Sequence, residues 1–140
     1  AAAAPARAPR RGAAAGFEGL KVLCIDDDRE ILDGMRMLLG RWGCNVAVAS
    51  TRAEALGNGR AAPDLIIVDH HLGAGDDGLA VSRALLEALD RPVPVLVLTA
   101  DRDGALTERV RSLGHTQLHK PVKPAALRAL MRHLVGSAGG

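Results

Sequence analysis

Three consecutive acids directly follow a short apolar run near the start of the chain. The stretch KVLCIDDDRE, residues 21–30, passes from apolar residues straight into Asp26, Asp27 and Asp28. Adjacent carboxylates repel one another, and the end of a strand in an α/β protein is a poor place to hide negative charge. The sequence therefore indicates that a positively charged group is bound at this point.

Three further polar residues close later apolar segments in the same manner. Asp69 follows LIIV, Thr99 follows VPVLVL, and Lys120 follows TQLH. Pro121 comes directly after the lysine, and a cis peptide bond there would turn the lysine side chain into the cleft. Asp69, Thr99 and Lys120 are therefore candidates for the same site as the three acids.

The apolar pattern predicts the elements that position these residues. Strands are expected at 20–25, 46–49, 65–68, 93–98 and 116–119, and helices near 31–42, 50–56, 81–89, 106–113 and 124–134. Strands that are apolar throughout indicate a parallel sheet buried on both faces. The expected fold class is α/β, a doubly wound three-layer sandwich.

The carboxyl ends of parallel strands share one edge of a sheet, so the polar residues should converge there. At about 4 Å and an effective dielectric near 20, each like-charge pair among Asp26, Asp27 and Asp69 costs about 4 kcal/mol. Either the acids protonate or a hard divalent cation binds, and oxygen ligands suit Mg²⁺. Thr99 and Lys120 could then bind two oxygens of a phosphoryl group.

The composition argues against nucleic-acid-binding and membrane-spanning proteins. A net charge of +2, one Phe, one Trp and no Tyr argue against nucleic acid as a partner. Cys24 and Cys44 are expected to be buried thiols in a reducing compartment, and no apolar run is long enough for a membrane span. A cytoplasmic location is expected. Residues 1–19 are interpreted as a flexible linker or tail, 20–136 as the domain, and 137–140 as a loose C-terminus.

Several polar residues near the site have simpler interpretations. Asp28 is expected to cap the first helix, and Asp76 and Asp77 the third. His70 and His71 have no cysteine partner, so they are expected to be solvated rather than to bind a transition metal.

The motifs LCIDDD, LIIVDHHL, VLVLTA and HKP resemble, in this order and spacing, the receiver domain of bacterial two-component response regulators. The resemblance covers about residues 20–135. It implies a flavodoxin-like five-stranded parallel sheet in the order 2-1-3-4-5. It also implies that the domain takes a phosphoryl group from a phosphohistidine and later hydrolyses the aspartyl phosphate.

The resemblance assigns roles to single residues. Asp69 would be the phospho-acceptor, and Asp26 and Asp27 would bind Mg²⁺ together with Asp69 and the backbone carbonyl of His71. Thr99 would be the switch hydroxyl, and Lys120 the phosphate-binding lysine. Many receivers carry Tyr or Phe three residues before this lysine. Here the position is Gln117, which puts the usual aromatic switch in doubt.

The resemblance extends to the setting of the domain. ILDGMRMLLGRWGC, LTADRD and KPVKPAALRALM are similar to the C-terminal receivers of hybrid sensor histidine kinases, and a stand-alone response regulator is the alternative. The implied partner is a histidine kinase domain or a histidine phosphotransfer protein, with a weak dimer as a further expectation. This domain itself is not expected to be an enzyme beyond accepting the phosphoryl group and dephosphorylating itself. The parent kinase could be anchored in a membrane.

Two rival interpretations come from other classes. Haloacid-dehalogenase-like phosphatases also place a DxD pair after a first strand, which Asp26 and Asp28 could form. That family needs acids after its lysine, and residues 121–140 contain none. A degenerate receiver that only binds proteins is the other rival, and the intact set of site residues argues against it.

Overall fold

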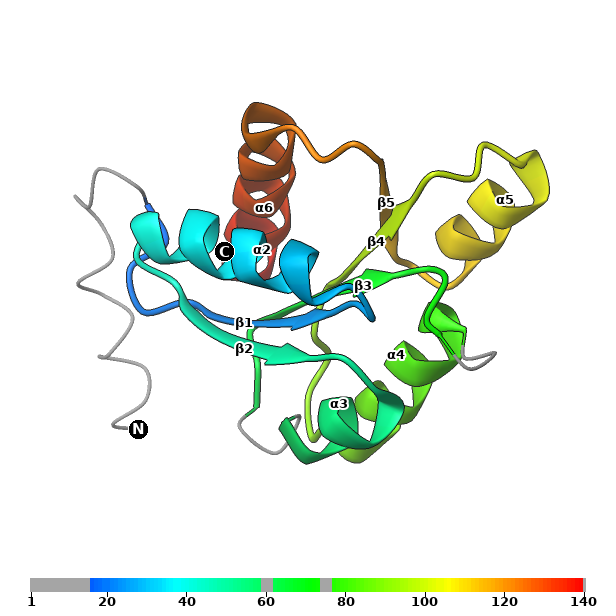
Figure 1. Cartoon of the computed structure of the whole chain (residues 1–140), viewed down its shortest axis with the longest axis horizontal. Coiled ribbons are helices and arrows are strands. Elements are labelled where there is room, and N and C mark those ends of the chain that lie inside the picture. Colours follow the sequence, from blue (N-terminus) through cyan, green and yellow to red (C-terminus); the bar gives the residue numbers. More distant parts are fainter. Residues whose placement is uncertain (1–15, 59–61, 74–76, 140) are drawn as a thin grey trace.

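The structure is a computed structural model that describes residues 16–58, 62–73 and 77–139. Strands and helices alternate along it, with helices on both sides of one central sheet (Figure 1). The strands are β1 (Lys21–Ile25), β2 (Asn45–Ala49), β3 (Leu65–Asp69), β4 (Val95–Thr99) and β5 (Thr116–His119). The helices are α2 (Arg29–Arg41), α3 (Arg52–Asn58), α4 (Gly78–Ala88), α5 (Gly104–Ser112) and α6 (Pro124–Gly139).

The sheet has the predicted topology. Its strand order is β2-β1-β3-β4-β5, and every neighbouring pair is parallel. The strands β3 and β4 are buried along their whole length, as strands covered on both faces must be. The α/β doubly wound sandwich expected from the sequence is confirmed.

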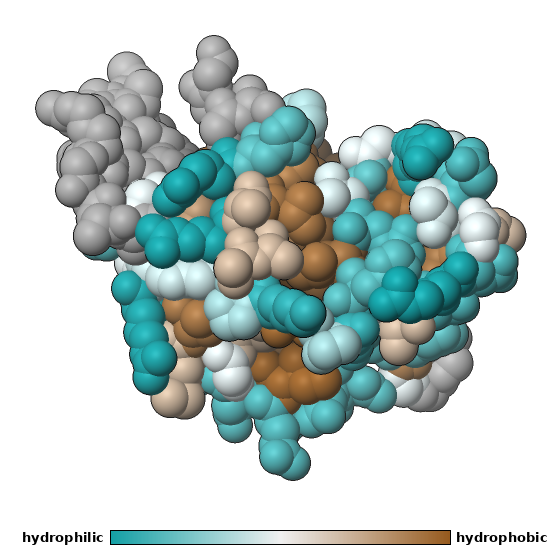
Figure 2. Space-filling view, turned by 90° about the horizontal axis from the view of Figure 1, so that it is seen from above, coloured by the Kyte–Doolittle hydropathy of each residue, from teal (hydrophilic) through white to brown (hydrophobic). Residues whose placement is uncertain are grey.

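Two apolar cores lie on opposite faces of the sheet, because successive strand residues point to opposite sides. Val22 and Cys24 of β1 pack with α2 and α6, whereas Leu23 and Ile25 pack with α3, α4 and α5. Figure 2 looks onto the molecule from above and shows apolar side chains gathered between hydrophilic ones. Among the described helices, none combines the length and the apolar character needed to cross a membrane.

Aspartate residues are the N-caps of three of the described helices. Asp28 accepts a hydrogen bond from the Glu30 N–H at the start of α2, and Asp77 accepts one from the Leu79 N–H at the start of α4. Asp103 caps α5 in the same way. The predicted caps at Asp28 and Asp77 are confirmed, and Asp76 lies outside the described residues. Each cap is worth about 1 kcal/mol and fixes where its helix starts.

The expected boundaries of the domain need two corrections. Phe17 is 2% exposed and packs on Trp42, with ring centroids 5.9 Å apart, so residues 16–19 belong to the fold. The low-complexity composition around this single aromatic residue hid its burial. At the other end α6 continues to Gly139, although residues 137–140 were expected to be loose. Residues 1–15 and 140 lie outside the described part.

Both cysteines are buried, as predicted. Burial, with a smaller contribution from the nearby charges of Cys44 and Asp26, raises the pKa of Cys24 to about 12. A thiol with so high a pKa stays protonated and unreactive at neutral pH. Cys24 therefore acts as an apolar side chain that packs in the core beneath α2.

Candidate functional site

Three carboxylates meet at the carboxyl edge of the sheet. Asp26 follows β1, Asp27 comes next, and Asp69 ends β3. One oxygen from each lies within 4.8 Å of the others. Asp26 and Asp69 are buried, at 3% and 6% exposure, while Asp27 faces solvent. Because β1 and β3 are adjacent parallel strands, their ends are forced together, and the predicted convergence of these acids is confirmed.

The backbone fixes Asp26 in place. Its N–H donates to the carbonyl of Ala49 at 3.1 Å, and its Oδ1 accepts from the Asp28 N–H at 2.9 Å. Its Oδ2 is buried and has no hydrogen-bond partner among the residues that the structure describes. Burial, followed by the charges of Asp69 and Asp27, raises the pKa of Asp26 to about 6. The hydrogen bond from the Asp28 N–H and the charge of Lys120 lower this pKa, but by less. The positive charge near Asp26 is therefore too weak to offset its burial and the two neighbouring carboxylates.

Lys120 supplies part of the missing charge. Its Nζ lies 2.7 Å from Oδ1 of Asp69 and 3.7 Å from Oδ2 of Asp26. The peptide bond between Lys120 and Pro121 is cis. From the sequence, such a bond is expected to turn the lysine side chain into the cleft. Burial lowers the pKa of Lys120, but its hydrogen bond to Asp69 and the two negative charges outweigh burial and raise the pKa. The ammonium group therefore stays charged in the cleft.

Thr99 ends β4 at the same edge of the sheet. It is 1% exposed, and its Oγ1 accepts a hydrogen bond from the Asp101 N–H at 2.9 Å. Its carbonyl accepts from the Lys120 N–H at 2.9 Å, which ties the ends of β4 and β5 together. The hydroxyl hydrogen of Thr99 can still donate to an anion in the cleft.

Two glycines allow the loop after β3 to approach the site. A Cβ at Gly78 would collide with the backbone carbonyl of Asp69, and a Cβ at Gly73 would lie 3.0 Å from Oδ2 of Asp27. The Gly78 N–H also donates to the carbonyl of His70 at 2.8 Å. The start of α4 can therefore approach the end of β3 only because Gly78 has no side chain, whereas a side chain at Gly73 would require a small movement of the exposed Asp27.

The site fits a magnesium ion. A buried carboxylate oxygen of Asp26 without a hydrogen bond, together with two further carboxylates within 4.8 Å, is an oxygen-rich and negatively charged ligand set. Mg²⁺ prefers such ligands and keeps several waters that substrate oxygens can replace. The role of the His71 carbonyl stays a prediction, as do the chemical roles of Asp69, Thr99 and Lys120.

Three further features surround the cleft: the cap at Asp28, the amide of Gln117 and an ion pair between α5 and the start of α4. Asp28 caps α2 with its side chain, and the carboxylates that gather with Asp26 are those of Asp27 and Asp69. Gln117 on β5 is half-buried, and its Nε2 finds no partner in the described parts of the chain. Sequence reasoning missed the ion pair between Arg109 and Asp77, at 3.5 Å, because no local pattern joins α5 to the start of α4.

The fold and the site define a receiver-type α/β domain with an acidic cleft. A model of the family "Response regulator receiver domain" matches residues 22–132. The chain belongs to this family and is a receiver domain of two-component signalling.

Several curated relatives are mycobacterial proteins. The response regulator MprA of Mycobacterium leprae is 35% identical over 116 residues, which cover 82% of this chain and 49% of the relative. The transcriptional regulatory protein PrrA of Mycobacterium tuberculosis is 35% identical over 117 residues, covering 83% of this chain and 48% of that protein. The chain thus spans about half the length of the curated relatives it matches. Because PrrA is named a transcriptional regulator, the comparisons do not support the expectation that nucleic acid is excluded as a partner.

Solved structures agree on the fold. The chemotaxis protein CheY4 of Vibrio cholerae has a TM-score of 0.75 and 26% identity, covering 83% of this chain and 98% of that one. The receiver domain of sensor histidine kinase PA1611 from Pseudomonas aeruginosa has a TM-score of 0.72 and 25% identity, covering 84% and 98%. The PA1611 structure has a magnesium ion coordinated in its active-site cleft.

Proposed function

We propose that this domain accepts a phosphoryl group on Asp69 in a magnesium-dependent reaction. The observation that supports the proposal best is the contact of 2.7 Å between Lys120 Nζ and Asp69 Oδ1, inside a cluster of three carboxylates. The lysine marks the place where a negatively charged oxygen is held. A carboxylate that reacts with a phosphoryl group needs such a cation beside it.

In the proposed reaction a carboxylate oxygen of Asp69 attacks the phosphorus of a phosphohistidine. The new oxygen–phosphorus bond forms as the nitrogen–phosphorus bond breaks, and the electron pair of that bond returns to the imidazole. Lys120 and the Thr99 hydroxyl bind two of the phosphoryl oxygens. Asp26, Asp27, Asp69 and the His71 carbonyl would hold Mg²⁺, which neutralises charge on the transferring group. Later hydrolysis of the aspartyl phosphate is the only turnover that we propose for this domain.

The proposed donor is the phosphohistidine of a histidine kinase domain or of a phosphotransfer protein. The similarity to the receiver of PA1611 supports a place beside a sensor kinase, as the sequence motifs first indicated. The higher identity to MprA, 35%, supports a response regulator instead. We favour the response-regulator setting on that ground. Phosphorylation by a kinase without onward transfer to a phosphotransfer protein would support it, and efficient onward transfer would favour the hybrid kinase.

Acetyl phosphate provides a direct test, because it replaces the donor and leaves the chemistry to this chain. With Mg²⁺ we expect the intact mass to rise by one phosphoryl group, and Asp69→Asn to abolish the gain. Asp33→Asn is the matched control, since Asp33 is an exposed acid of α2 outside the cleft. Equal phosphorylation of the Asp69→Asn variant would place the acceptor at another residue and refute the proposal. A parent chain that gains no phosphoryl group would also refute it and leave a domain that only binds proteins.

A further inference from the structure

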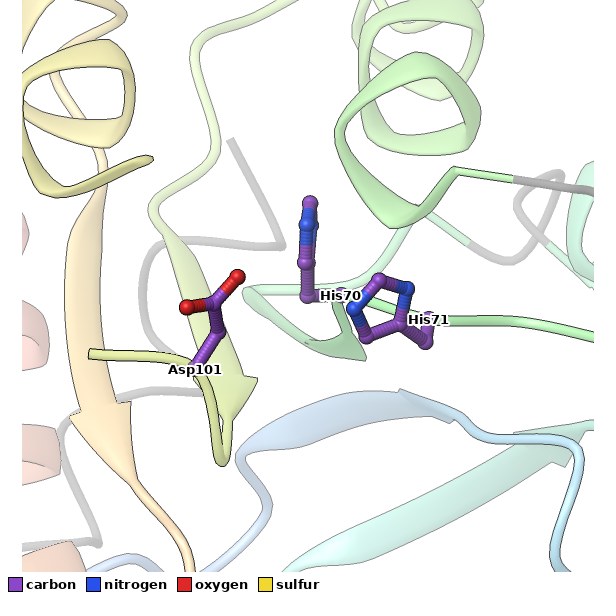
Figure 3. Close-up of side chains that lie close together, drawn as sticks. All are labelled: His70, His71 and Asp101. Carbon is purple, nitrogen blue, oxygen red and sulfur yellow. The ribbon is translucent and has the colours of Figure 1, made fainter. Parts of the chain in front are cut away.

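A second group of metal-ligating side chains lies beside the acidic cleft. His70 and His71 follow β3, and Asp101 follows β4. One ligand atom from each lies within 4.8 Å of the others. Figure 3 shows the His70 ring between the Asp101 carboxylate and the His71 ring. We propose that these three residues, the His–His–Asp cluster, bind a zinc ion at a site separate from the acidic cleft.

The ligand types distinguish the two sites. The His–His–Asp cluster offers two imidazole nitrogens and one carboxylate, whereas the cleft offers only oxygens. Imidazole is a preferred ligand of Zn²⁺, and carboxylate and carbonyl oxygens suit Mg²⁺. Three protein ligands and a water complete the usual four-coordinate shell of zinc. Excess Mg²⁺ can therefore fill the acidic cleft, while the two imidazole nitrogens favour zinc at the His–His–Asp cluster.

The expectation that both histidines are solvated holds for His71 and is wrong for His70, whose ring nitrogen Nδ1 is buried. The His70 side chain is 12% exposed, and its Nδ1 makes no hydrogen bond within residues 16–58, 62–73 and 77–139. Oδ1 of Asp77 lies 3.7 Å from this nitrogen and already accepts from the Leu79 N–H at 2.8 Å. A cation on the ring satisfies the nitrogen directly, or binds the other nitrogen and turns the N–H toward Asp77.

The other two ligands are held by the backbone. The Asp101 N–H donates to Thr99 Oγ1, and Asp101 Oδ1 accepts from the Asp103 N–H, both at 2.9 Å. These bonds orient the carboxylate and leave its second oxygen for the ion. A β-bridge to Asp77 fixes the backbone of His71, and the two histidine rings lie 4.4 Å apart between centroids. The ligands therefore need little rearrangement to bind, which lowers the entropy cost of binding.

A zinc ion bound at the cluster would link two segments of the chain. It joins the segment after β3 to the segment after β4, and these strands end in Asp69 and Thr99. Asp101 contacts the Thr99 hydroxyl through its own N–H. Zinc at the cluster therefore restrains the segment next to the hydroxyl at the rim of the cleft.

Zinc chloride titration against a chromophoric chelator tests the proposal on the full chain, in excess Mg²⁺ to fill the acidic cleft. We expect one zinc per chain. His71→Gln and Asp101→Asn should each weaken its affinity by about tenfold or more, since each removes one of three ligands. The exposed His71 and the retained cap oxygen in Asp101→Asn keep the fold intact. His133→Gln, at an exposed position of α6, is the matched control and should bind as the parent chain does.

A second measurement needs no variant. The imidazole NMR signals of His70 and His71 should shift on addition of one equivalent of zinc, while that of His133 stays in place. Absence of zinc binding, displacement of zinc by Mg²⁺, unchanged affinity in both variants, or unshifted His70 and His71 signals would each overturn the proposal. The outcome is independent of Asp69 phosphorylation.

Discussion

Lys120 Nζ lies 2.7 Å from Asp69 Oδ1, so the ammonium group contacts the carboxylate that is the proposed phospho-acceptor. It also faces Oδ2 of Asp26 at 3.7 Å, and thereby serves two buried carboxylates at once. The lysine thus has two functions that can be separated by experiment. It offsets the repulsion between Asp26 and Asp69 in the resting domain, and it is proposed to bind the phosphoryl group in the reacting one.

Lys120→Met should impair both functions. Removal of one partner from a fully buried ion pair costs about 3–5 kcal/mol, but Lys120 is 26% exposed and solvent screens part of its charge. We therefore expect a loss of about 1–2 kcal/mol in the free energy of unfolding, measured with urea and EDTA at neutral pH. Phosphorylation by acetyl phosphate should fall at least about tenfold. Lys123→Met, at an exposed position, should change neither quantity.

Asp26 should make the metal-free domain less stable as the pH rises. Its pKa is raised to about 6 from an unfolded value of 3.8, so between these values the folded state binds more protons than the unfolded state. The free energy of unfolding contributed by Asp26 therefore falls as the pH rises from about 4 to about 6. At pH 7.5 in EDTA, Asp26→Asn should be about 1–3 kcal/mol more stable than the parent chain.

The comparison with the variant isolates Asp26 from other titrating groups. The difference in free energy between the two proteins should shrink toward pH 4, where the parent carboxyl is protonated. Added Mg²⁺ should stabilise the parent chain and have a much smaller effect on Asp26→Asn. A difference that does not depend on pH would contradict the assignment of the raised pKa to Asp26.

Asp28 should matter for the helix and not for the cation. Asp28→Ala removes the hydrogen bond from the Glu30 N–H and should lower the free energy of unfolding by about 1 kcal/mol. The Mg²⁺ affinity, measured by isothermal titration calorimetry, should stay within about twofold, because the Asp28 N–H that binds Asp26 is retained. A large loss of Mg²⁺ affinity would place Asp28 among the ligands.

Gln117 should limit the conformational response. Many receivers have an aromatic residue here whose rotation follows the threonine hydroxyl, and this chain has a half-buried amide instead. NMR spectra with and without beryllofluoride and Mg²⁺ should therefore differ at the cleft and little elsewhere. Large shifts of backbone signals across residues 99–114 would show that switching proceeds without the aromatic side chain.

Strong local patterns made most of the fold predictable. The uninterrupted apolar character of Leu65–Asp69 and Val95–Thr99 indicated buried parallel strands, and parallel strands bring their carboxyl ends to one edge. The convergence of Asp26, Asp69 and Lys120 follows from that rule and from the order of the strands. The order itself came from the resemblance to receivers, because apolar patterning does not say which strands are neighbours.

Contacts between distant segments were not predictable in the same way. Phe17 stands alone in a stretch of Ala, Pro, Gly and Arg, and only its contact with Trp42 shows that it is part of the core. Asp101 could not be paired with His70 and His71 from the sequence, since loop geometry after two different strands brings them together. Side chains that meet across loops leave no periodic signal along the chain.

The central claim is that Asp69 receives the phosphoryl group. It is tested most directly by reducing the acetyl-phosphate-treated domain with borohydride, which converts an aspartyl phosphate to homoserine, and mapping the product by mass spectrometry. We predict homoserine at position 69, dependent on Mg²⁺ and at least about tenfold less abundant when Lys120 is replaced by Met. Homoserine at position 26 or 27, or a stable phosphate ester on Thr99, would contradict the assignment.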